Sequence, residues 1–427
     1  MDVQYLIIGA GVSGLACASK LPKDSNYLLL EKETEAGGYC RTFYQDGYVW
    51  DYAGHFFHFR NEDIRKEFLD LLVEPDMVRN KKNTKIYYKN RYIDYPFQSN
   101  IHQLEKDEFI ECLVDLFTRK NATVYNFKQM LYSKFGKSIT EKFLSPYNTK
   151  LYACDLDNLD KDAMGRFFPY AEPEEIVKGF RKEQKVTYNE EFYYSKRGAR
   201  VFVDRLITKI SLKKILFEEN VIKIDLENKI VVTNKQEYRY EYLVSTIPFV
   251  DFIKFSNIKF DTQLSSNKVL VFNMGFDKKP IDTSIHWIYY PEPEICFYRV
   301  GFYNNILHEN DMSIYVEIGF PKNEEVKLDY WLDRVLFDLK KVGVVTNHRL
   351  LSYNSIIMDP AYVHVRGETT AEKEELKLRL RKQGVHLIGR YGDWTYCSIE
   401  DCIAQGYETA ALMREGELDV VKNTPTI

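Results

Sequence analysis

The first residues of the chain predict two buried strands joined by a helix. Residues 5–8 and residues 28–30 are continuous apolar runs, whereas residues 12–20 carry apolar side chains at helical spacing. A short continuous apolar run is typical of a strand that is covered on both faces. This order of elements therefore predicts a parallel α/β sheet at the start of the chain.

The apolar spacing becomes helical between residues 100 and 182. Residues 109–117 place apolar side chains at i, i+3, i+4 and i+7, and residues 125–135 repeat the pattern up to Gly136. The segment Ser138-Ile-Thr-Glu141 has the pattern of a capping box, so we expect another helix to begin there. These residues predict a helical insertion.

From residue 192 onwards, short apolar strands alternate with polar turns. Earlier in the chain, a helix is predicted at 61–73 with Ile64, Phe68, Leu71 and Leu72 on one face, and a hairpin at 85–94 around Lys89 and Asn90. The predicted strands are 215–217, 221–225, 229–233, 242–248, 269–272, 285–290, 296–300, 313–318 and 386–389, and the predicted helices are 330–342 and 399–414. The four strands between residues 269 and 318 predict an antiparallel sheet. The tail 421–427 has the composition of a frayed end.

The composition of the 427 residues is that of a globular protein and narrows the class of partners. Hydrophobic residues make up 45% of the chain and charged residues 29%, which is ordinary for a soluble protein. The net charge of -4 leaves no basic excess for nucleic acid. No apolar run is long enough to span a membrane, and the first one is too short for a signal peptide.

Seven cysteines are scattered along the chain without a C-x-x-C pair. This spacing favours a reducing compartment, which we expect to be the cytoplasm, and we expect no metal site. Cys397 and Cys402 lie close in sequence, and we expect them to be unpaired small side chains.

A glycine motif connects the first predicted strand to the first helix. Gly9, Gly11 and Gly14 form a G-x-G-x-x-G run, and Glu31 follows the second strand. The glycines permit a tight turn, a close approach of a pyrophosphate and close helix packing, and the acid can accept hydrogen bonds from a ribose. The helix N-terminus offers free N–H groups to the phosphates. The motif predicts a dinucleotide site.

The fold class that follows is α/β, with a Rossmann-like dinucleotide-binding domain interrupted by a helical insertion and an antiparallel β-sheet domain. We expect the dinucleotide-binding domain to comprise residues 1–80, 190–250 and 381–427, the helical substrate-side domain residues 100–189, and the sheet domain residues 81–99 and 251–380.

A glycine pair, Gly37 and Gly38, stands six residues after Glu31. This spacing resembles FAD enzymes of the glutathione-reductase-like type, in which a second backbone loop meets the cofactor. The spacing alone leaves NAD(H) open as the alternative dinucleotide.

Several aromatic–polar segments lie outside the glycine motif. The most specific are Tyr95-Pro-Phe-Gln98, Pro146-Tyr-Asn-Thr-Lys150, Tyr289-Tyr-Pro-Glu292 with Phe297-Tyr-Arg299, and Gly389-Arg-Tyr-Gly-Asp-Trp-Thr-Tyr396. Together they resemble the UDP-galactopyranose mutase family, closest to its eukaryotic-type branch, from Tyr5 to about Met413.

The resemblance implies an isomerase that interconverts the pyranose and furanose rings of a nucleotide-activated galactose for surface glycan synthesis. It implies FAD that works in its reduced form, primed by NAD(P)H or another reductant, through a covalent bond between flavin N5 and the sugar. The implied partner is a nucleotide-sugar, expected to be UDP-linked, and a homo-oligomer stays open.

Residue roles follow from the same resemblance. Arg299 and Arg166 match the pair that holds the diphosphate, a task that suits guanidinium groups, and His55 matches the histidine beside the flavin. The implied substrate contacts are Tyr95, Gln98, Asn148, Tyr152, Tyr289, Tyr362 and Tyr396. The implied cofactor contacts are Gly9, Gly11, Gly14, Glu31, Gly38, Val221, Gly389 and Arg390.

Three positions depart from the family pattern. Tyr152 replaces a Trp, Ile306 replaces a substrate-facing Tyr, and Glu400 replaces an Asn near the substrate. These positions leave the sugar and the nucleotide open. Ser398 is expected to cap the last helix, whose N-terminus would point at the flavin, so Glu400 and Asp401 would have to face away.

Two other functions stay open. A flavin oxidase of the amine oxidase or protoporphyrinogen oxidase type fits the glycine motif equally well, but it needs an apolar cavity and no arginine pair. A non-catalytic flavoprotein or NAD(H)-binding partner would leave the aromatic–polar segments without a bound polar ligand to explain them.

Overall fold

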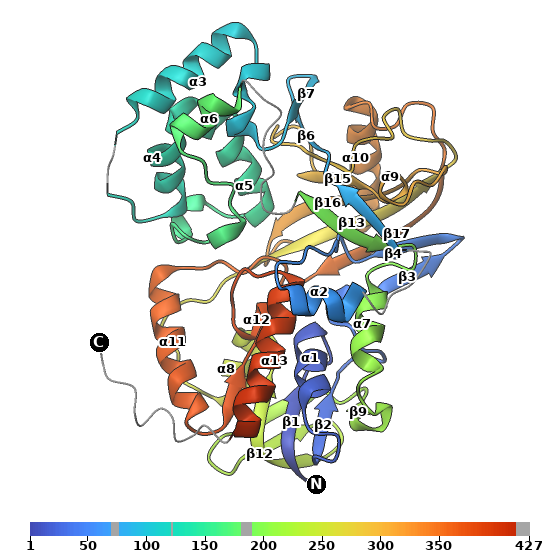
Figure 1. The fold of residues 1–427 in the computed structure, drawn as a ribbon, viewed down its shortest axis with the longest axis vertical. Coiled ribbons are helices and arrows are strands. Elements are labelled where there is room, and N and C mark those ends of the chain that lie inside the picture. Colours follow the sequence, from blue (N-terminus) through green and yellow to red (C-terminus); the bar gives the residue numbers. More distant parts are fainter. Residues whose placement is uncertain (70–76, 121–122, 181–189, 416–427) are drawn as a thin grey trace.

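The computed structural model describes residues 1–69, 77–120, 123–180 and 190–415. Within these residues, two seven-stranded sheets, two two-stranded sheets and a group of helices form the fold (Figure 1). The predicted residues Leu71 and Leu72 and the tail 421–427 lie outside the described residues.

Parallel strands occupy the centre of the first sheet. Its order is β10 (Val221–Asp225), β11 (Ile230–Thr233), β12 (Glu237–Ser245), β1 (Asp2–Ile8), β2 (Tyr27–Leu30) and β9 (Ile215–Leu216), and β18 (Val385–Leu387) pairs with β12. Ile8 lies between Ser245 and Leu30, its parallel partners on the two neighbouring strands. The side chains of Leu6 and Ile7 are completely buried, which confirms the predicted parallel sheet.

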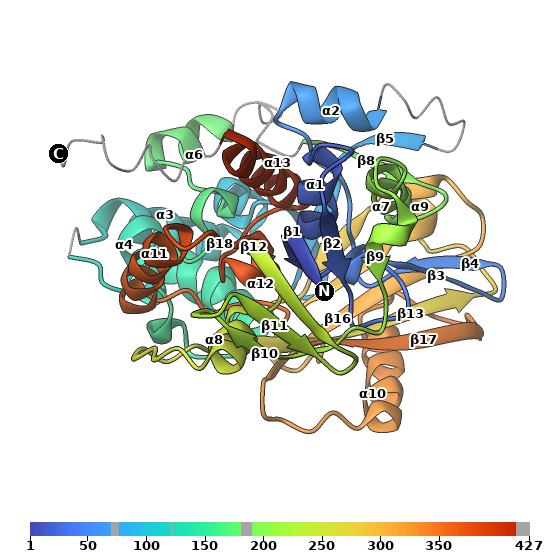
Figure 2. The same ribbon diagram turned by 90° about the horizontal axis from the view of Figure 1, so that it is seen from below.

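Helices cover both faces of this sheet (Figure 2). One face packs against α1 (Val12–Lys20), α2 (Glu62–Leu69), α7 (Arg200–Ile207) and α13 (Ile399–Glu415), and the other packs against α8 (Phe249–Ser256) and α11 (Gly367–Arg381). Helices α1 and α13 lie close against each other. A Cβ added to Gly406 would lie only 2.7 Å from the Ser13 carbonyl oxygen, so a glycine at this position permits the close approach. The C-terminal helix thus covers the helix that follows the glycine motif.

The second sheet is mostly antiparallel. Its order is β17 (Leu350–Met358), β13 (Asn267–Phe276), β16 (Ser313–Pro321), β15 (Arg299–Phe302), β14 (Trp287–Tyr289), β6 (Thr84–Tyr88) and β7 (Arg91–Asp94). Strands β14 and β6 pair in parallel, so the sheet is mixed. Lys89 and Asn90 form the turn between β6 and β7 at φ values of 48° and 63°, which confirms the predicted hairpin. Helix α10 (Leu328–Lys341) packs on one face.

The helical region lies beside the second sheet (Figure 1). It contains α3 (Lys106–Thr118), α4 (Phe127–Ile139), α5 (Ser145–Tyr152) and α6 (Pro173–Gly179). Gly136 interrupts α4 with a φ of 76°. The predicted capping box at Ser138 is wrong, because the Ser138 N–H and hydroxyl both donate to the carboxylate of Asp115 on α3.

The remaining elements are short. They are β3 (Thr42–Gln45), β4 (Tyr48–Asp51), β5 (Met77–Lys81), β8 (Glu191–Ser195), α9 (Tyr303–Leu307), α12 (Gly389–Gly392), a π-helical turn (Thr140–Leu144) and the 3₁₀ turns Gly38–Cys40, Phe97–Ser99, Ile101–Gln103, Leu156–Asn158, Gly165–Phe167 and Leu212–Lys214.

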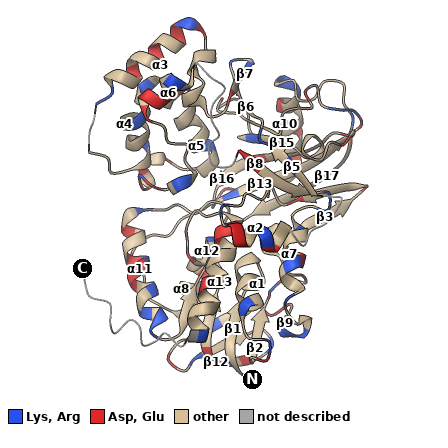
Figure 3. Cartoon of the chain, in the orientation of Figure 1, with Lys and Arg blue, Asp and Glu red and all other residues tan. Residues whose placement is uncertain are grey.

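Acidic and basic side chains are interspersed over the helices (Figure 3). Within the part of the chain that the structure describes, no helix is both long and apolar enough to cross a bilayer.

Candidate active site

The glycine motif forms the turn between β1 and α1. Gly9 has a φ of 97°, and Gly14 lies so close to the Gly9 carbonyl that a Cβ there would collide with it. A Cβ on Gly11 would meet nothing within 4 Å. Gly11 is the residue that precedes α1, and no side chain there accepts a hydrogen bond from the first turn of the helix. The backbone N–H groups at the helix N-terminus are therefore available to an anion.

Glu31 at the end of β2 joins this turn. Its Oε2 accepts the Ala10 N–H at 2.8 Å and its Oε1 accepts the Glu33 N–H at 3.0 Å. The side chain is buried, and each oxygen retains a lone pair that could accept from a ribose hydroxyl.

Three further segments meet the turn. Gly38 has a φ of 55°, and a Cβ there would lie 3.4 Å from the Gly11 Cα. Gly389 has a φ of 83°, and a Cβ there would collide with the Ser13 hydroxyl. Val221 begins β10, two residues after Glu219, whose N–H donates to the Glu31 carbonyl at 2.9 Å. This backbone-lined cradle fits a dinucleotide.

Beyond the cradle, Arg390 on α12 points into a group of tyrosine rings. Its guanidinium carbon lies 4.6 Å from the Tyr396 ring centroid and 5.2 Å from that of Tyr362. Its Nη1 also donates to the Cys397 carbonyl at 2.9 Å. Such stacking suits the planar guanidinium group.

Arg299 on β15 is a second arginine among the tyrosines, and its side chain is 20% exposed. Its Nε and Nη2 donate to the two carboxylate oxygens of Glu317 on β16, the second at 2.7 Å. Glu317 is only 1% exposed. Burial opposes the charge on Arg299, but Glu317 and the neighbouring tyrosines raise the pKa of its guanidinium well above the ordinary value. The group therefore stays charged in a largely apolar enclosure.

Tyrosine rings connect the two arginines. Their ring-centroid distances are 5.1 Å for Tyr95–Tyr289, 5.0 Å for Tyr147–Tyr289, 5.8 Å for Tyr152–Tyr362 and 5.9 Å for Tyr362–Tyr396. Burial raises the pKa of the Tyr289 hydroxyl and of the Tyr152 hydroxyl. These phenols stay protonated and can donate hydrogen bonds to a bound anion.

His55 follows β4 and lies near both arginines. Burial, and then the positive charges of Arg390 and Arg299, lower the pKa of its imidazole to about 4. Its Nδ1 is buried and meets no hydrogen-bond partner among the described residues. A neutral imidazole therefore stands between the cradle and the tyrosines.

Gln98 and Asn148 lie in the helical region, and each is buried. Gln98 donates its amide to the Pro169 carbonyl, and Asn148 donates to the Leu144 carbonyl at 2.7 Å. Within the described residues, the side-chain carbonyl oxygen of each one has no donor. Together with the Tyr152 hydroxyl, which also lacks a partner there, they form a set of buried polar atoms that suits a polar ligand.

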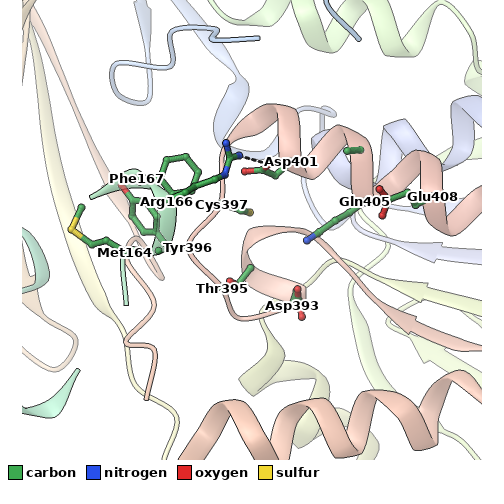
Figure 4. A pocket seen from close by; sticks show the side chains of 12 residues that line it. Met164, Arg166, Phe167, Asp393, Thr395, Tyr396, Cys397, Asp401, Gln405 and Glu408 are labelled. Atoms are coloured by element: carbon green, nitrogen blue, oxygen red, sulfur yellow. Dashed lines mark hydrogen bonds and ion pairs between the residues drawn. The ribbon is translucent and has the colours of Figure 1, made fainter. Parts of the chain in front are cut away.

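Arg166 lies at an open cavity of about 340 Å³ (Figure 4). It pairs with Asp401 in the first turn of α13, and its guanidinium lies 4.6 Å from the Phe167 ring. The Phe167 ring contacts that of Tyr396 at 5.1 Å. Arg166 and Arg299 thus each hold a carboxylate, and Phe167 and Tyr396 link Arg166 to the tyrosine group.

Two of the three departing positions have structural partners. The Ile306 side chain is fully buried, and its carbonyl accepts from Asn80 at 2.9 Å. Glu400 is buried and accepts the N–H groups of Arg60 and Asn61 at 2.8 and 2.7 Å. Its carboxylate thereby accepts hydrogen bonds from the backbone immediately before α2.

Sequence reasoning missed Glu317. The sequence feature that could have identified it is a glutamate within the apolar run of residues 313–318, because burying an unpaired carboxylate has a large free-energy cost. Tyr147 and Tyr315 were also missed, although Tyr315 lies under Arg299 at 5.7 Å.

Comparison with known proteins finds similarity around the glycine motif. Residues 7–72 match the NAD(P)-binding Rossmann-like domain. All-trans-retinol 13,14-reductase of Rattus norvegicus is 38% identical over 74 residues, which are 17% of this chain and 12% of that protein. The mitochondrial protoporphyrinogen oxidase of Nicotiana tabacum is 28% identical over 182 residues, which are 38% of this chain and 34% of that protein. The chain therefore spans about a third or less of these two relatives.

Solved structures match over the whole chain. Reduced UDP-galactopyranose mutase superposes with a TM-score of 0.88 at 22% identity, covering 99% of this chain and 98% of that one. A protein of Exiguobacterium sp. 255-15 named for protoporphyrinogen oxidase has a TM-score of 0.76 at 17% identity, covering 97% and 99%. Cyclohexylamine oxidase of Brevibacterium oxydans has a TM-score of 0.70 at 14% identity, covering 97% and 99%. These similarities confirm the predicted fold class.

Proposed function

We propose that the protein binds FAD and is a UDP-galactopyranose mutase or a close relative, which interconverts the pyranose and furanose forms of a nucleotide-activated sugar. The observation that carries this proposal is the mostly buried, charged Arg299 among the phenols of Tyr289 and Tyr362. A permanently charged, buried arginine among hydrogen-bond donors suits a diphosphate. The fold shared with reduced UDP-galactopyranose mutase supports it.

The cradle of backbone and Glu31 fits the dinucleotide. Gly9, Gly11 and Gly14 would hold its pyrophosphate, and Gly38, Val221, Gly389 and Arg390 would contact its other parts. Bound FAD, once reduced by NAD(P)H or another reductant, supplies the nucleophile that allows the sugar ring to open and reclose.

The two arginines hold the leaving group in this proposal. Glu317 accepts from two of the five N–H donors of Arg299, so three remain for phosphate oxygens. Arg166 reaches the diphosphate by exchanging Asp401 for a phosphate oxygen. Tyr289, Tyr362 and Tyr396 add phenolic donors, which hold the nucleoside diphosphate near the sugar while it is detached.

The buried polar atoms of the helical region bind the nucleotide end. Gln98 and Asn148 offer carbonyl oxygens to the N–H groups of the base, and Tyr95 and Tyr152 offer aromatic rings. His55 stays uncharged near the reacting centre because the two arginines oppose its protonation. It can therefore donate or accept one hydrogen bond without adding charge.

An oxidase is the second candidate, and the match to tobacco protoporphyrinogen oxidase favours it. Its substrate would be apolar, whereas the site has two arginines and many phenols. A porphyrinogen or amine oxidase would consume oxygen in proportion to product.

Product analysis separates these functions. Dithionite-reduced protein is incubated with UDP-galactose and a panel of other UDP- and dTDP-sugars, and pyranose and furanose products are resolved by chromatography. We expect ring isomerisation of at least one nucleotide-sugar, without stoichiometric consumption of oxygen or NAD(P)H. Stoichiometric consumption would support the oxidase, and the absence of any furanose product across the panel would contradict the mutase.

A further inference from the structure

The two cysteines that flank the start of α13 are in contact. The Sγ atoms of Cys397 and Cys402 lie 3.6 Å apart at hydrogen-bonding distance, although both thiols are free. Sequence spacing alone suggested unrelated small side chains. Between the two cysteines, the Ser398 hydroxyl oxygen accepts the Asp401 N–H in the first turn of α13 at 3.2 Å.

Cys402 lies in surroundings that stabilise a thiolate. The hydrogen bond with Cys397 lowers the pKa of the Cys402 thiol to about 7 against the opposing effect of burial, and Ser13 and Arg390 lower it further. The same hydrogen bond raises the pKa of the Cys397 thiol well above its ordinary value, so the charge that remains when the pair loses one proton lies on Cys402. Thiolates are the reactive form of cysteine.

Cys397 provides the access. It lines the open cavity beside Arg166 and Asp401 (Figure 4), whereas Cys402 is turned toward Ser13 in the glycine turn. Cys397 thus forms part of the cavity wall, although the residue is only 8% exposed, and the partly exposed Cys402 contacts its sulfur from the side of Ser13. The other five cysteines include Cys17, Cys40 and Cys112, whose thiol pKa burial raises.

We propose that Cys397 and Cys402 form a redox-active dithiol that reacts reversibly with low-molecular-weight disulfides entering this cavity. The inference is independent of the proposed isomerase activity. Cys397 passes its proton to the Cys402 thiolate across their hydrogen bond, attacks one sulfur of the disulfide and releases one thiolate. Cys402 then attacks the Cys397 sulfur and releases the second, so that one external disulfide becomes two thiols and the protein gains one disulfide. The two cysteine protons pass to the released thiolates.

The proposed disulfide would act on the candidate active site through Arg390. This side chain donates to the Cys397 carbonyl and stacks on the Tyr396 ring. Drawing the sulfurs from 3.6 Å to a bond length of about 2.05 Å moves the segment that carries that carbonyl. Oxidation would therefore shift Arg390 and the Tyr396 ring that it stacks on.

Peptide mapping tests the proposal, because trypsin releases both cysteines on one peptide, residues 391–414. Purified protein with its bound cofactor is reduced, freed of reductant, exposed to oxidised glutathione, alkylated and digested. We expect this peptide to lose both alkylation sites and two hydrogen atoms, about tenfold faster than any other cysteine reacts, and to recover both thiols with dithiothreitol.

Three variants sharpen the test. Cys402→Ser should trap glutathione on Cys397, Cys397→Ser should slow the reaction of Cys402 by about tenfold, and Cys40→Ser should behave like the unmodified protein. Full alkylation of peptide 391–414 after glutathione treatment would overturn the proposal, as would a crosslink of this peptide to Cys40. Peptide mapping of the unmodified protein tests the proposal by itself, even if one of the variants does not fold.

Discussion

At the scale of single residues, Arg299 stays charged in a buried position because Glu317 accompanies it. The two residues are direct partners on β15 and β16. The sequence identified Arg299 through its motif but could not identify Glu317, because the register of two strands depends on contacts distant in sequence. Similarly, Gln98 and Asn148 were named from motifs, but the buried environment that leaves their carbonyl oxygens unsatisfied exists only in the folded chain.

Replacement of Arg299 tests the diphosphate role. Arg299→Ala is expected to lower turnover of the nucleotide-sugar by more than about a thousandfold, because a transition-state contact to developing charge is lost. Bound flavin, measured by absorbance, should stay at the level of the unmodified protein. Arg239→Ala, on an exposed position of β12, serves as the control. Activity within tenfold of the control would exclude the proposed contact.

Replacement of Glu317 tests the ion pair itself. Glu317→Gln leaves a buried guanidinium without its counter-charge, and the free energy of unfolding should fall by about 3 kcal/mol. Urea denaturation measures this loss. The exposed Glu227→Gln should change stability by less than about 0.5 kcal/mol. An equal effect of the two substitutions would show that Arg299 finds its counter-charge elsewhere.

At the scale of elements, the first turn of α13 holds several parts of the molecule together. The Ser398 hydroxyl oxygen accepts the Asp401 N–H at 3.2 Å, and the Asp401 carboxylate accepts the Ser398 N–H at 2.8 Å. Glu400 binds the start of α2, and Asp401 also pairs with Arg166. The cap at Ser398 was predicted correctly from a local pattern. The similar pattern at Ser138 failed because Asp115 from a neighbouring helix takes the same donors.

Removal of the Glu400 carboxylate should weaken the start of α2. Glu400→Ala leaves the N–H groups of Arg60 and Asn61 without their acceptor, so stability should fall by about 1–2 kcal/mol. Thermal or urea denaturation measures the change, and Glu408→Ala on an exposed position of the same helix is the matched control. A loss no larger than that of the control would mean that another acceptor replaces Glu400.

Close approach of α1 and α13 can be tested at Gly406. A Cβ there would lie 2.7 Å from the Ser13 carbonyl and 2.8 Å from the Cys17 N–H. Gly406→Ala is therefore expected to separate the helices, lower stability by about 1–3 kcal/mol and weaken cofactor retention, as measured by flavin release during dialysis. Leu412→Ala on an exposed part of α13 should retain the cofactor. Full retention by Gly406→Ala would show that the helices adjust freely.

At the scale of the whole molecule, the sequence predicted the parts whose information is local. The glycine turn, the β6–β7 hairpin and helix α10 each lie within one short segment and have the predicted form. The order of strands in the second sheet could not be predicted, since β6 (Thr84–Tyr88) pairs with β14 (Trp287–Tyr289), which lies far later in the chain. Such pairings depend on the packing of whole layers rather than on residue pattern.

Acid should destabilise the whole molecule through its buried histidines. Burial lowers the pKa of His55, His58, His286 and His386 to about 4, whereas unfolded histidines titrate near about 6.5. Between these values the unfolded chain binds more protons, so stability should fall as pH decreases from about 6.5 towards 4. Each histidine contributes up to about 1.4 kcal/mol per pH unit.

Urea titrations at pH 7.5, 6.0 and 5.0 would measure this slope. Asp51 opposes it, because burial raises the pKa of its carboxyl to about 6, but it is one group against four. Because Asp51 offsets one histidine, His386→Asn should reduce the net slope by about a third relative to the unmodified protein. A stability that does not change over this range would show that the histidines are protonated inside the folded protein.

Helix α13, which covers the helix after the glycine turn, is among the last parts of the chain to be synthesised. Strand β18 and helix α13 begin only at residues 385 and 399, yet α13 packs on the helix that starts at residue 12. At about 5–20 residues per second, ribosomal synthesis takes roughly 20–80 s to reach them. Throughout that interval the nascent dinucleotide cradle lacks Gly389 and Arg390. Stable cofactor capture must therefore wait for the final segment of translation, and chaperones would encounter the first sheet while one face of α1 is still bare.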